Sequence, residues 1–357
     1  MAQPRRAGRR ARTEEARLLV RAKRLFDGGA DVAADAVYRR ILERNPTHPG
    51  ALSGRAEALT AFARDAESLC EHADACREQS LYDSAVLCYA RARGLDPDSR
   101  DAVWGHADCS ISLGDEATAI EAYRRYLELE PGEPEALHML AALGEGPSPQ
   151  RCSDAYISDY FDRFADDFDR KLVDELTYRA PEQMVAALRP ILGEPRGQLS
   201  ILDLGCGTGL TGRLFRVYAA RLDGVDLSPA MLEKAGERGI FDTLAETEIG
   251  RYLAATPHRY DLIVAGDVLE YFGSLAEVFE GATRALAPAG LFAFSVEASD
   301  IRDYRLTPSG RYVHGRPYIA RAAESAGLRE VAVIREPIRY EYAEPVDGDI
   351  WILEKPV

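Results

Sequence analysis

The apolar positions divide the chain into two parts with different periodicities. In the first 145 residues, small, aromatic and aliphatic residues recur at the spacing of one face of a helix. From residue 199 onward, short apolar runs alternate with longer amphipathic segments, a pattern typical of a mostly parallel sheet covered by helices on both faces. The stretch GEGPSP at 144–149 separates the two parts and has the composition of a linker.

The second part is expected to alternate strands with helices. The strands are predicted at 200–204, 221–226, 262–265, 291–296, 331–336 and 350–354. The helices are predicted at 209–218, 229–238, 275–286 and 317–326. Because the last two strands are close in sequence, residues 334–356 are expected to form an antiparallel hairpin at the end of the sheet.

The first part contains an internal repeat. One pattern of small, aromatic and apolar residues ending in proline occurs three times, as Ala34/Tyr38/Ile41/Pro46, Ala85/Tyr89/Ala92/Pro97 and Ala119/Tyr123/Tyr126/Pro131. The last two copies are 34 residues apart, and this pattern resembles the tetratricopeptide repeat, a helix–turn–helix unit. The first two copies are 51 residues apart, so residues 51–67 are expected to add one helix or a degenerate repeat. Residues 134–143 are expected to cap the array.

Composition narrows the classes of partner. The net charge of −15 disfavours non-specific binding to nucleic acid, and 46% hydrophobic with 29% charged residues is typical of a globular protein. The six cysteines contain no CxxC pair, so we expect no metal site and reduced thiols, as in a cytoplasmic protein. The basic stretch 1–12 is expected to be disordered rather than a signal peptide, and no segment is long and apolar enough to predict a membrane span.

The segment ILDLGCGTG at 201–209 carries the clearest chemical signal. An apolar strand enters a glycine-rich turn and then a helix, at the edge of an α/β sheet where ligands bind. Gly205 would allow the tight turn, Gly207 a close approach of the ligand to the backbone, and Gly209 close packing of the helix. A pyrophosphate-binding fingerprint would place a sixth-position glycine where this chain has Leu210.

Two acidic residues flank the glycines. Asp203 precedes the first glycine by two positions and is expected to face the pocket, where it would repel pyrophosphate and attract a cationic group. Asp226 ends the next strand, 21 residues after Gly205, and is placed to accept the hydroxyls of a ribose. Together with the glycines, these carboxylates favour S-adenosylmethionine (SAM) over NAD or FAD. Residues 153–357 therefore resemble the class I SAM-dependent methyltransferases. This resemblance implies a Rossmann-like domain with a mostly parallel seven-stranded sheet that includes one antiparallel strand.

This resemblance implies further site residues. Those that would contact the cofactor are Asp203, Gly205, Cys206, Gly207, Gly209, Asp226, Leu227, Met231, Glu248, Ile249 and Asp267. Glu246 competes with Glu248 for the position at the adenine, and Met231 would serve equally well as a core residue. Asp267 would face the methyl end, with Glu270 and Tyr271 toward the substrate. Combined with the repeats, the sequence resembles bacterial methyltransferases that contain tetratricopeptide repeats, a resemblance that bears on the architecture and leaves the substrate open.

Two segments are candidates for the acceptor site. In 158–170, Tyr160, Phe164 and Phe168 recur every four residues, so one helical face would either cover the pocket as a lid or pack on the sheet. The stretch 309–319 is expected to overhang the ends of the strands. It contains Arg311, Tyr312, His314 and Arg316.

The reaction chemistry stays open at this point. An amine or hydroxyl acceptor requires a base, for which His314, Asp267, Tyr312 and Glu270 are candidates, whereas a carboxylate acceptor would be oriented by Arg311 and Arg316. No NPPY-like tetrad follows the fourth strand, so methylation of adenine, cytosine or a glutamine amide is not expected.

Three functions follow from these predictions. The first is a methyltransferase acting on an O or N nucleophile of a small-molecule or carrier- or peptide-bound substrate. The second is a protein methyltransferase that recruits its target through the groove of the repeats. The third is a non-catalytic scaffold that retains SAM binding. The expected domains are a tail (1–12), repeats (13–145), linker and lid helices (146–198) and a methyltransferase domain (199–357).

Overall fold

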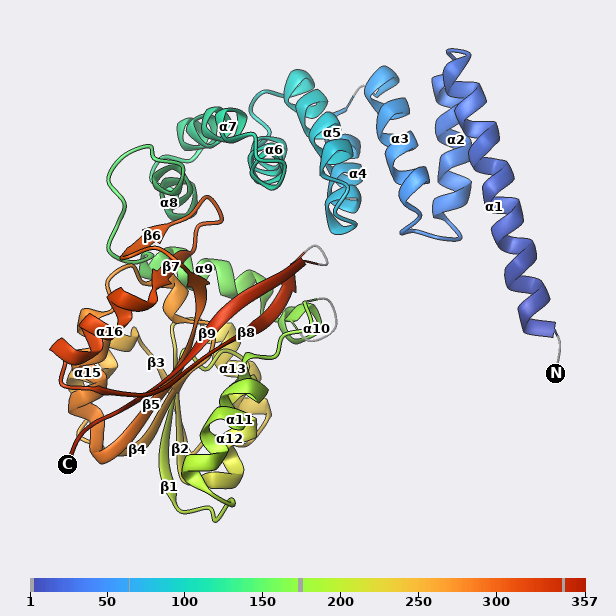
Figure 1. The fold of residues 1–357 in the computed structure, drawn as a ribbon. Helices are drawn as coiled ribbons and strands as arrows, with labels where there is room; N and C mark the ends of the chain where they lie inside the picture. The colour runs from blue at the N-terminus through green and yellow to red at the C-terminus, as the bar shows by residue number, and fades with distance from the viewer. Residues whose placement is uncertain (1–2, 64, 173–175, 342–343) are drawn as a thin grey trace. The chain divides into compact units, whose positions relative to one another are not determined.

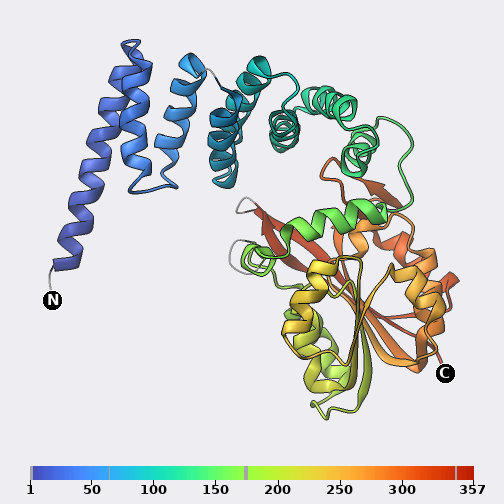
Figure 2. The ribbon, with the colours of Figure 1, turned by 180° about the vertical axis from the view of Figure 1, so that it is seen from behind.

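The computed structural model describes residues 3–63, 65–172, 176–341 and 344–357. The chain forms two compact units, Met1–Glu145 and Gly146–Val357, in agreement with the linker composition of 144–149. Each unit is described separately below (Figures 1 and 2).

The first unit is entirely helical. Its helices are α1 (Gln3–Asp27), α2 (Asp31–Leu42), α3 (Pro49–Phe62), α4 (Ala66–Glu78), α5 (Tyr82–Leu95), α6 (Arg100–Ser112), α7 (Glu116–Leu129) and α8 (Pro134–Ala142). Residues 3–12, which we expected to be disordered, form the first turns of α1. Arginine and alanine dominate this stretch and both have high helix propensity, so the helix continues into it.

The repeat pattern determines how the helices pack. Tyr38, Tyr89 and Tyr123 are each only 1% exposed. A Cβ placed on Gly54 would lie 2.3 Å from the ring of Tyr38, and one on Gly105 would lie 2.2 Å from the ring of Tyr89. α3 therefore packs on α2 through a glycine and a tyrosine ring, in the same way as α6 packs on α5. It is the additional helix expected at 51–67, and α4 begins a new helical pair.

The second unit is built on a twisted, mostly parallel sheet (Figure 1). Its order is β3-β2-β1-β4-β5, followed by β9 and then β8. β9 is antiparallel to both of its neighbours, which confirms a mostly parallel sheet with an antiparallel strand. In the described residues the sheet has nine strands instead of the expected seven, because two short strands described below are added to it. These strands are β1 (Leu199–Leu204), β2 (Ala219–Asp226), β3 (Thr243–Glu246), β4 (Tyr260–Ala265), β5 (Leu286–Ser299), β8 (Arg329–Glu341) and β9 (Glu344–Glu354).

Two further short strands extend the sheet beyond the prediction. The end of β5 pairs in parallel with β7 (Tyr312–Gly315), which pairs in turn with β6 (Tyr304–Leu306). The stretch 309–319, expected to overhang the strand ends as a loop, thus contributes a strand and the start of α16 (Arg316–Ser325).

Helices cover both faces of the sheet (Figures 1 and 2). α11 (Ala180–Leu192) and α12 (Leu210–Phe215) pack on the face that includes Ile201. α14 (Ile249–Ala255), α15 (Ala276–Ala285) and α16 pack on the face that includes Leu202 and Leu204. The glycine-rich turn thus starts from a strand buried on both sides, which fixes its position. In the described part of the chain, every helix is too short or too polar to cross a bilayer.

The remaining elements lie before and between the strands. α9 (Asp154–Phe164) and α10 (Phe168–Arg170) precede the sheet, and α13 (Pro229–Glu237) follows β2. Two single 3-10 turns, η2 (Arg216–Tyr218) and η3 (Leu269–Tyr271), follow α12 and β4.

Candidate functional site

The glycine-rich turn adopts the backbone conformation that its residues predict. Gly205, Gly207 and Gly209 all have positive φ, at +62°, +51° and +91°. A Cβ on Gly205 would lie 2.3 Å from Cγ2 of Val268, so the turn packs directly against the segment after β4. At Gly207 the nearest atom would be 3.8 Å away, on the ring of Phe168. Gly205 therefore makes the turn possible, and Gly207 leaves the backbone accessible from the cavity.

Asp226 joins the end of β2 to this turn. Its carboxylate accepts the backbone N–H of Gly207 at 2.8 Å and that of Ser228 at 2.9 Å. Burial raises the pKa of Asp226 above its ordinary value, against the effect of these backbone donors. The carboxylate is thus fixed at the wall of a cavity, with lone pairs left for a ligand.

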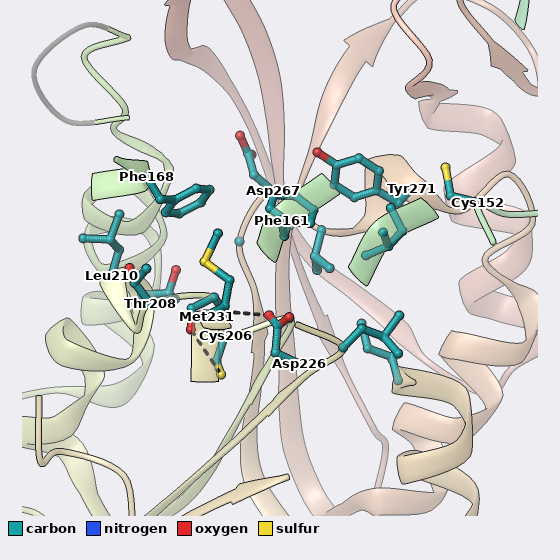
Figure 3. Close-up of a pocket in the computed structure, with 18 of the residues that line it drawn as sticks. Cys152, Phe161, Phe168, Cys206, Thr208, Leu210, Asp226, Met231, Asp267 and Tyr271 are labelled. Carbon is teal, nitrogen blue, oxygen red and sulfur yellow. Dashed lines mark hydrogen bonds between the residues drawn. The ribbon is translucent and has the colours of Figure 1, made fainter. Parts of the chain in front are cut away.

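A cavity of about 880 Å³, open solvent included, lies at the carboxyl ends of β1, β2 and β4. In Figure 3, Asp226 lies at one end and Asp267 and Tyr271 at the other, with Met231 and Phe161 between them and Phe168 to one side of Asp267. The predicted site residues that line it are Gly205, Cys206, Gly207, Asp226, Leu227, Met231, Glu248, Ile249, Asp267, Tyr271 and Phe168.

Glu248, rather than its competitor Glu246, lines the cavity. Its carboxylate caps α14 by accepting the N–H of Arg251 at 2.9 Å, and only 7% of the residue is exposed. Glu246 is exposed at the end of β3. Glu248 therefore caps α14 and is also a polar residue in the wall of the cavity.

Asp203 and Gly209 do not line the cavity, contrary to expectation. Side chains alternate along β1, so Asp203 shares the face of Ile201 and lies against α12, where a Cβ on Gly212 would be 2.9 Å from Oδ2. It is fully buried, and burial raises its pKa to about 8. Gly209 begins α12, and a Cβ there would meet the ring of Phe241 at 2.9 Å. Asp203 and Gly209 therefore pack against α12 and Phe241, on the side of the glycine-rich turn away from the cavity.

Asp267 is held in a strained conformation at the far end of the cavity. Its φ of +49° is unusual for a residue with a side chain. Its N–H donates to Oγ of Ser295 at 2.7 Å, and the Ser295 hydroxyl donates back to Oδ1 at 2.8 Å. Arg339, from β8, donates to Oδ2 at 2.9 Å. These contacts fix both the backbone and the carboxylate of Asp267.

A cluster of buried charges lies behind Asp267. Arg339 is 3% exposed and also pairs with Glu297, which in turn pairs with Arg311 at 2.9 Å. Glu270 is 3% exposed, and burial together with the charge of Asp267 raises its pKa to about 8. Glu270 does not line the cavity, whereas its neighbour Tyr271 does. Arg339 and Glu297 were not among the site residues predicted from the sequence.

The predicted residues of 309–319 lie away from the cavity. His314 is fully buried, with Nε2 3.1 Å from the carbonyl of Gly273, and burial lowers its pKa to about 4. The hydroxyl of Tyr312 donates to the carbonyl of Pro149 at 2.5 Å. Arg316 forms an ion pair with Asp349 at 2.6 Å. Strand pairing draws the segment into the fold, so neither the candidate base His314 nor the candidate clamp Arg316 lines the cavity.

The aromatic segment before the sheet matches the lid prediction only in part. α9 ends at Phe164, so Phe168 lies on the separate helix α10 and shares no continuous face with Tyr160. Phe161 and Phe168 line the cavity, whereas the rings of Tyr160 and Phe164 pack on each other at 4.8 Å. Ile157 and Phe161 are spaced i, i+4 and both line the cavity, a signal that sequence analysis missed.

Polar contacts attach this segment to the loops around the cavity. Asp162 accepts the hydroxyl of Ser228 at 2.5 Å and the N–H of Ala230 at 3.2 Å. Asp169 accepts the hydroxyl of Thr208 and pairs with Arg238. The aromatic side chains are thereby held over the glycine-rich turn.

Comparison with known proteins finds a match in each of the two units. Residues 202–292 match the family model described as a methyltransferase domain, and residues 70–134 match the tetratricopeptide repeat. The crystal structure of the N-methyltransferase NodS from Bradyrhizobium japonicum WM9 with S-adenosyl-L-homocysteine superimposes with a TM-score of 0.45 and 21% identity. The aligned region covers 56% of this chain and 99% of the NodS chain.

Two curated relatives show the extent of the sequence similarity. The human methyltransferase-like protein 27 is 38% identical over 99 residues, which are 28% of this chain and 40% of that protein. The ubiquinone biosynthesis O-methyltransferase of Methylobacterium sp. (strain 4-46) is 30% identical over 158 residues, 39% of this chain and 63% of that protein. The matched stretches span less than two thirds of these relatives. By these matches residues 202–292 are similar to methyltransferase domains, and residues 70–134 are similar to tetratricopeptide repeats.

Proposed function

We propose that this protein transfers the methyl group of SAM to an O or N nucleophile of a small-molecule or carrier- or peptide-bound acceptor. One observation carries the proposal. A single cavity joins a glycine-rich turn and two carboxylates, Asp226 and Glu248, to a third carboxylate, Asp267, at its other end. The glycine-rich turn with Asp226 and Glu248 suits a nucleoside, and Asp267 lies where an acceptor would enter.

The residues present fit the cofactor. Gly207 presents backbone without a Cβ to the cavity, and Asp226 keeps acceptor capacity for ribose hydroxyls beyond its two backbone donors. Met231 and Ile249 offer apolar surface for a base, with Glu248 beside them. When bound, SAM supplies a methyl group on a positively charged sulfur, which is intrinsically reactive toward nucleophiles.

The remaining chemistry falls to the protein. It must orient the acceptor behind the methyl group and exclude water, and Phe161, Phe168 and Tyr271 are the side chains that shield the cavity. Asp267 is the polar group placed to align an N–H or O–H of the acceptor and to take up its proton. Of the four candidate bases, only Asp267 lines the cavity.

Titration of the full chain with SAM and with S-adenosylhomocysteine in a calorimeter tests the cofactor assignment. Incubation with radiolabelled SAM and panels of amine, phenol and acid acceptors tests transfer. Binding without transfer to any acceptor would favour the non-catalytic scaffold, and absence of binding would contradict both.

A second candidate is a methyltransferase that recruits a protein or peptide target through its repeats. It is favoured by the match of residues 70–134 to the tetratricopeptide repeat, in a unit separate from the one that contains the cavity. Removing residues 1–145 distinguishes the two candidates. Loss of methylation of a protein target, with methylation of a small acceptor preserved, supports recruitment. Cytoplasmic location and bacterial origin stay predictions from the sequence.

A further inference from the structure

We infer that the methyl acceptor presents an amine, and that a carboxylate is rejected. This inference rests on the proposed function, because it concerns the far end of the same cavity. Three observations support the inference: which charged groups line that end of the cavity, which of the nearby charged groups already have a charged partner, and which side chains surround them.

Asp267 is the charged group at the acceptor end in the described part of the chain. The other charged residues that line the cavity in the described part of the chain are Arg151, Asp226 and Glu248. Asp226 lies at the opposite end (Figure 3). Arg151 pairs with Asp154 at 2.6 Å and donates to the carbonyl of Cys152 at 3.0 Å. An incoming acceptor therefore meets the carboxylate of Asp267, which is paired with Arg339.

The nearby guanidinium groups are engaged by carboxylates. Arg339 pairs with Asp267 at 2.9 Å and also with Glu297, and Arg311 pairs with Glu297 at 2.9 Å. To bind either one, an acceptor carboxylate would have to displace a largely buried ion pair. Such a displacement leaves a buried charge without a partner, so it is strongly unfavourable.

The surroundings of Asp267 favour a cationic or N–H-bearing group. Each carboxylate oxygen accepts one hydrogen bond, from Ser295 or Arg339, and retains a second lone pair. Phe161, Phe168 and Tyr271 line the same cavity, and the faces of aromatic rings attract ammonium groups. An amine thus finds a fixed acceptor for its N–H groups and a shell that tolerates its charge.

The transfer step balances for an amine. The nitrogen lone pair forms the new N–C bond as the bond from the methyl carbon to sulfur breaks, and sulfur retains that electron pair. One nitrogen proton passes to Asp267 and from there to water. A protonated amine must first lose a proton to become a nucleophile, and Asp267 is placed to accept it.

The test compares three probes of similar size on the full-length protein saturated with S-adenosylhomocysteine. These are phenethylamine, 3-phenylpropionate and 2-phenylethanol, each titrated calorimetrically. We expect phenethylamine to bind at least about tenfold more tightly than the other two, as for a hydrogen bond to a charged group. In Asp267→Asn this preference should be lost, and the carboxylate should gain affinity because one donor of Arg339 is released.

Asp349→Asn is the matched control. Asp349 is also buried and is also paired with arginines, Arg316 and Arg335, but it does not line the cavity. The amine preference should persist in this variant. The inference is overturned if the carboxylate or the alcohol binds as tightly as the amine, if no probe binds, or if Asp267→Asn retains the preference. Failure of S-adenosylhomocysteine itself to bind would instead contradict the proposed function.

Discussion

Replacing Glu270 by glutamine should change how the stability of the second unit depends on pH. Glu270 is 3% exposed, and burial together with the charge of Asp267 raises its pKa to about 8 from 4.5. Between these two values the folded protein keeps a proton that the unfolded chain releases. The free energy of unfolding must therefore fall as pH rises through this window.

The size of the effect follows from proton linkage. One proton held only in the folded state changes the unfolding free energy by up to about 1.4 kcal/mol per pH unit. The contribution is fully present below about pH 4.5 and is lost as pH rises through about 8. Asp203, whose pKa is also raised to about 8 by burial, adds a slope of the same sign. Glutamine cannot titrate, so Glu270→Gln should remove the part of this decline that Glu270 contributes.

Tryptophan fluorescence allows the second unit to be followed by itself. The chain has two tryptophans, and Trp104→Phe leaves Trp351, which is 1% exposed and stacks on Phe294 in the sheet. Urea unfolding of this background at several pH values between 5 and 8, with and without Glu270→Gln, gives the slopes directly. Glu277→Gln on the exposed side of α15 is the control and should leave the slope unchanged.

The outcome that would refute this reasoning is equal slopes in the Glu270→Gln variant and its parent. Glu270 would then ionise in the folded protein as it does in water. The charged cluster behind Asp267 would in that case carry one more negative charge than it does with Glu270 protonated. A slope of opposite sign in the parent would contradict the assignments of both Glu270 and Asp203.

Three further predictions test the site and its supports. Asp226→Asn should weaken binding of S-adenosylhomocysteine about 10- to 100-fold by calorimetry, and unchanged affinity would show that another group holds the ribose. Gly205→Ala should destabilise the second unit by about 1–3 kcal/mol more than Gly239→Ala in urea unfolding, because φ is +62° at both positions but only Gly205 is crowded. Equal losses would mean that the turn relaxes. Arg339→Met should cost about 3–5 kcal/mol by the same assay, since it leaves two largely buried carboxylates without this partner. Arg335→Met on the same strand should cost less, because Asp349 keeps Arg316 as a partner. Similar costs would show that the two ion pairs of Arg339 are no more important than the pair of Arg335 with Asp349.

Local sequence pattern was sufficient to predict the fold. The alternation of apolar runs predicted the sheet and its late hairpin, and the period of 34 residues predicted the helical array. Both signals reside in contiguous residues, so no long-range information was needed. The strand pair β6–β7 was missed because its strands have three and four residues, too few for a periodic pattern to emerge.

The site was predictable where a motif lies within one βα turn. Gly205 and Gly207 of that turn, and Asp226 at the end of the next strand, line the cavity, because the end of a buried strand fixes where the next residues go. Asp203 was misplaced because its spacing from the glycines was weighed, and the alternation of side chains along β1 was not. His314 resembled a candidate base only while its segment was taken for a loop. Pairing with the end of β5 buries it.

Arg339 shows why the acceptor end could not be predicted. It lies on β8, 72 residues after Asp267, and follows Ile338, which packs in the core of the sheet. In an alternating strand such an arginine is expected to face solvent. Here it lies at the carboxyl end of β4 instead, and a guanidinium buried there requires carboxylates around it. Glu297 and Asp267 meet that requirement, so the charge of the acceptor end follows from how β8 joins the sheet. The hairpin thereby supplies the positive charge beside the acceptor end that we propose, although the hairpin itself contributes no residue to the described lining of the cavity.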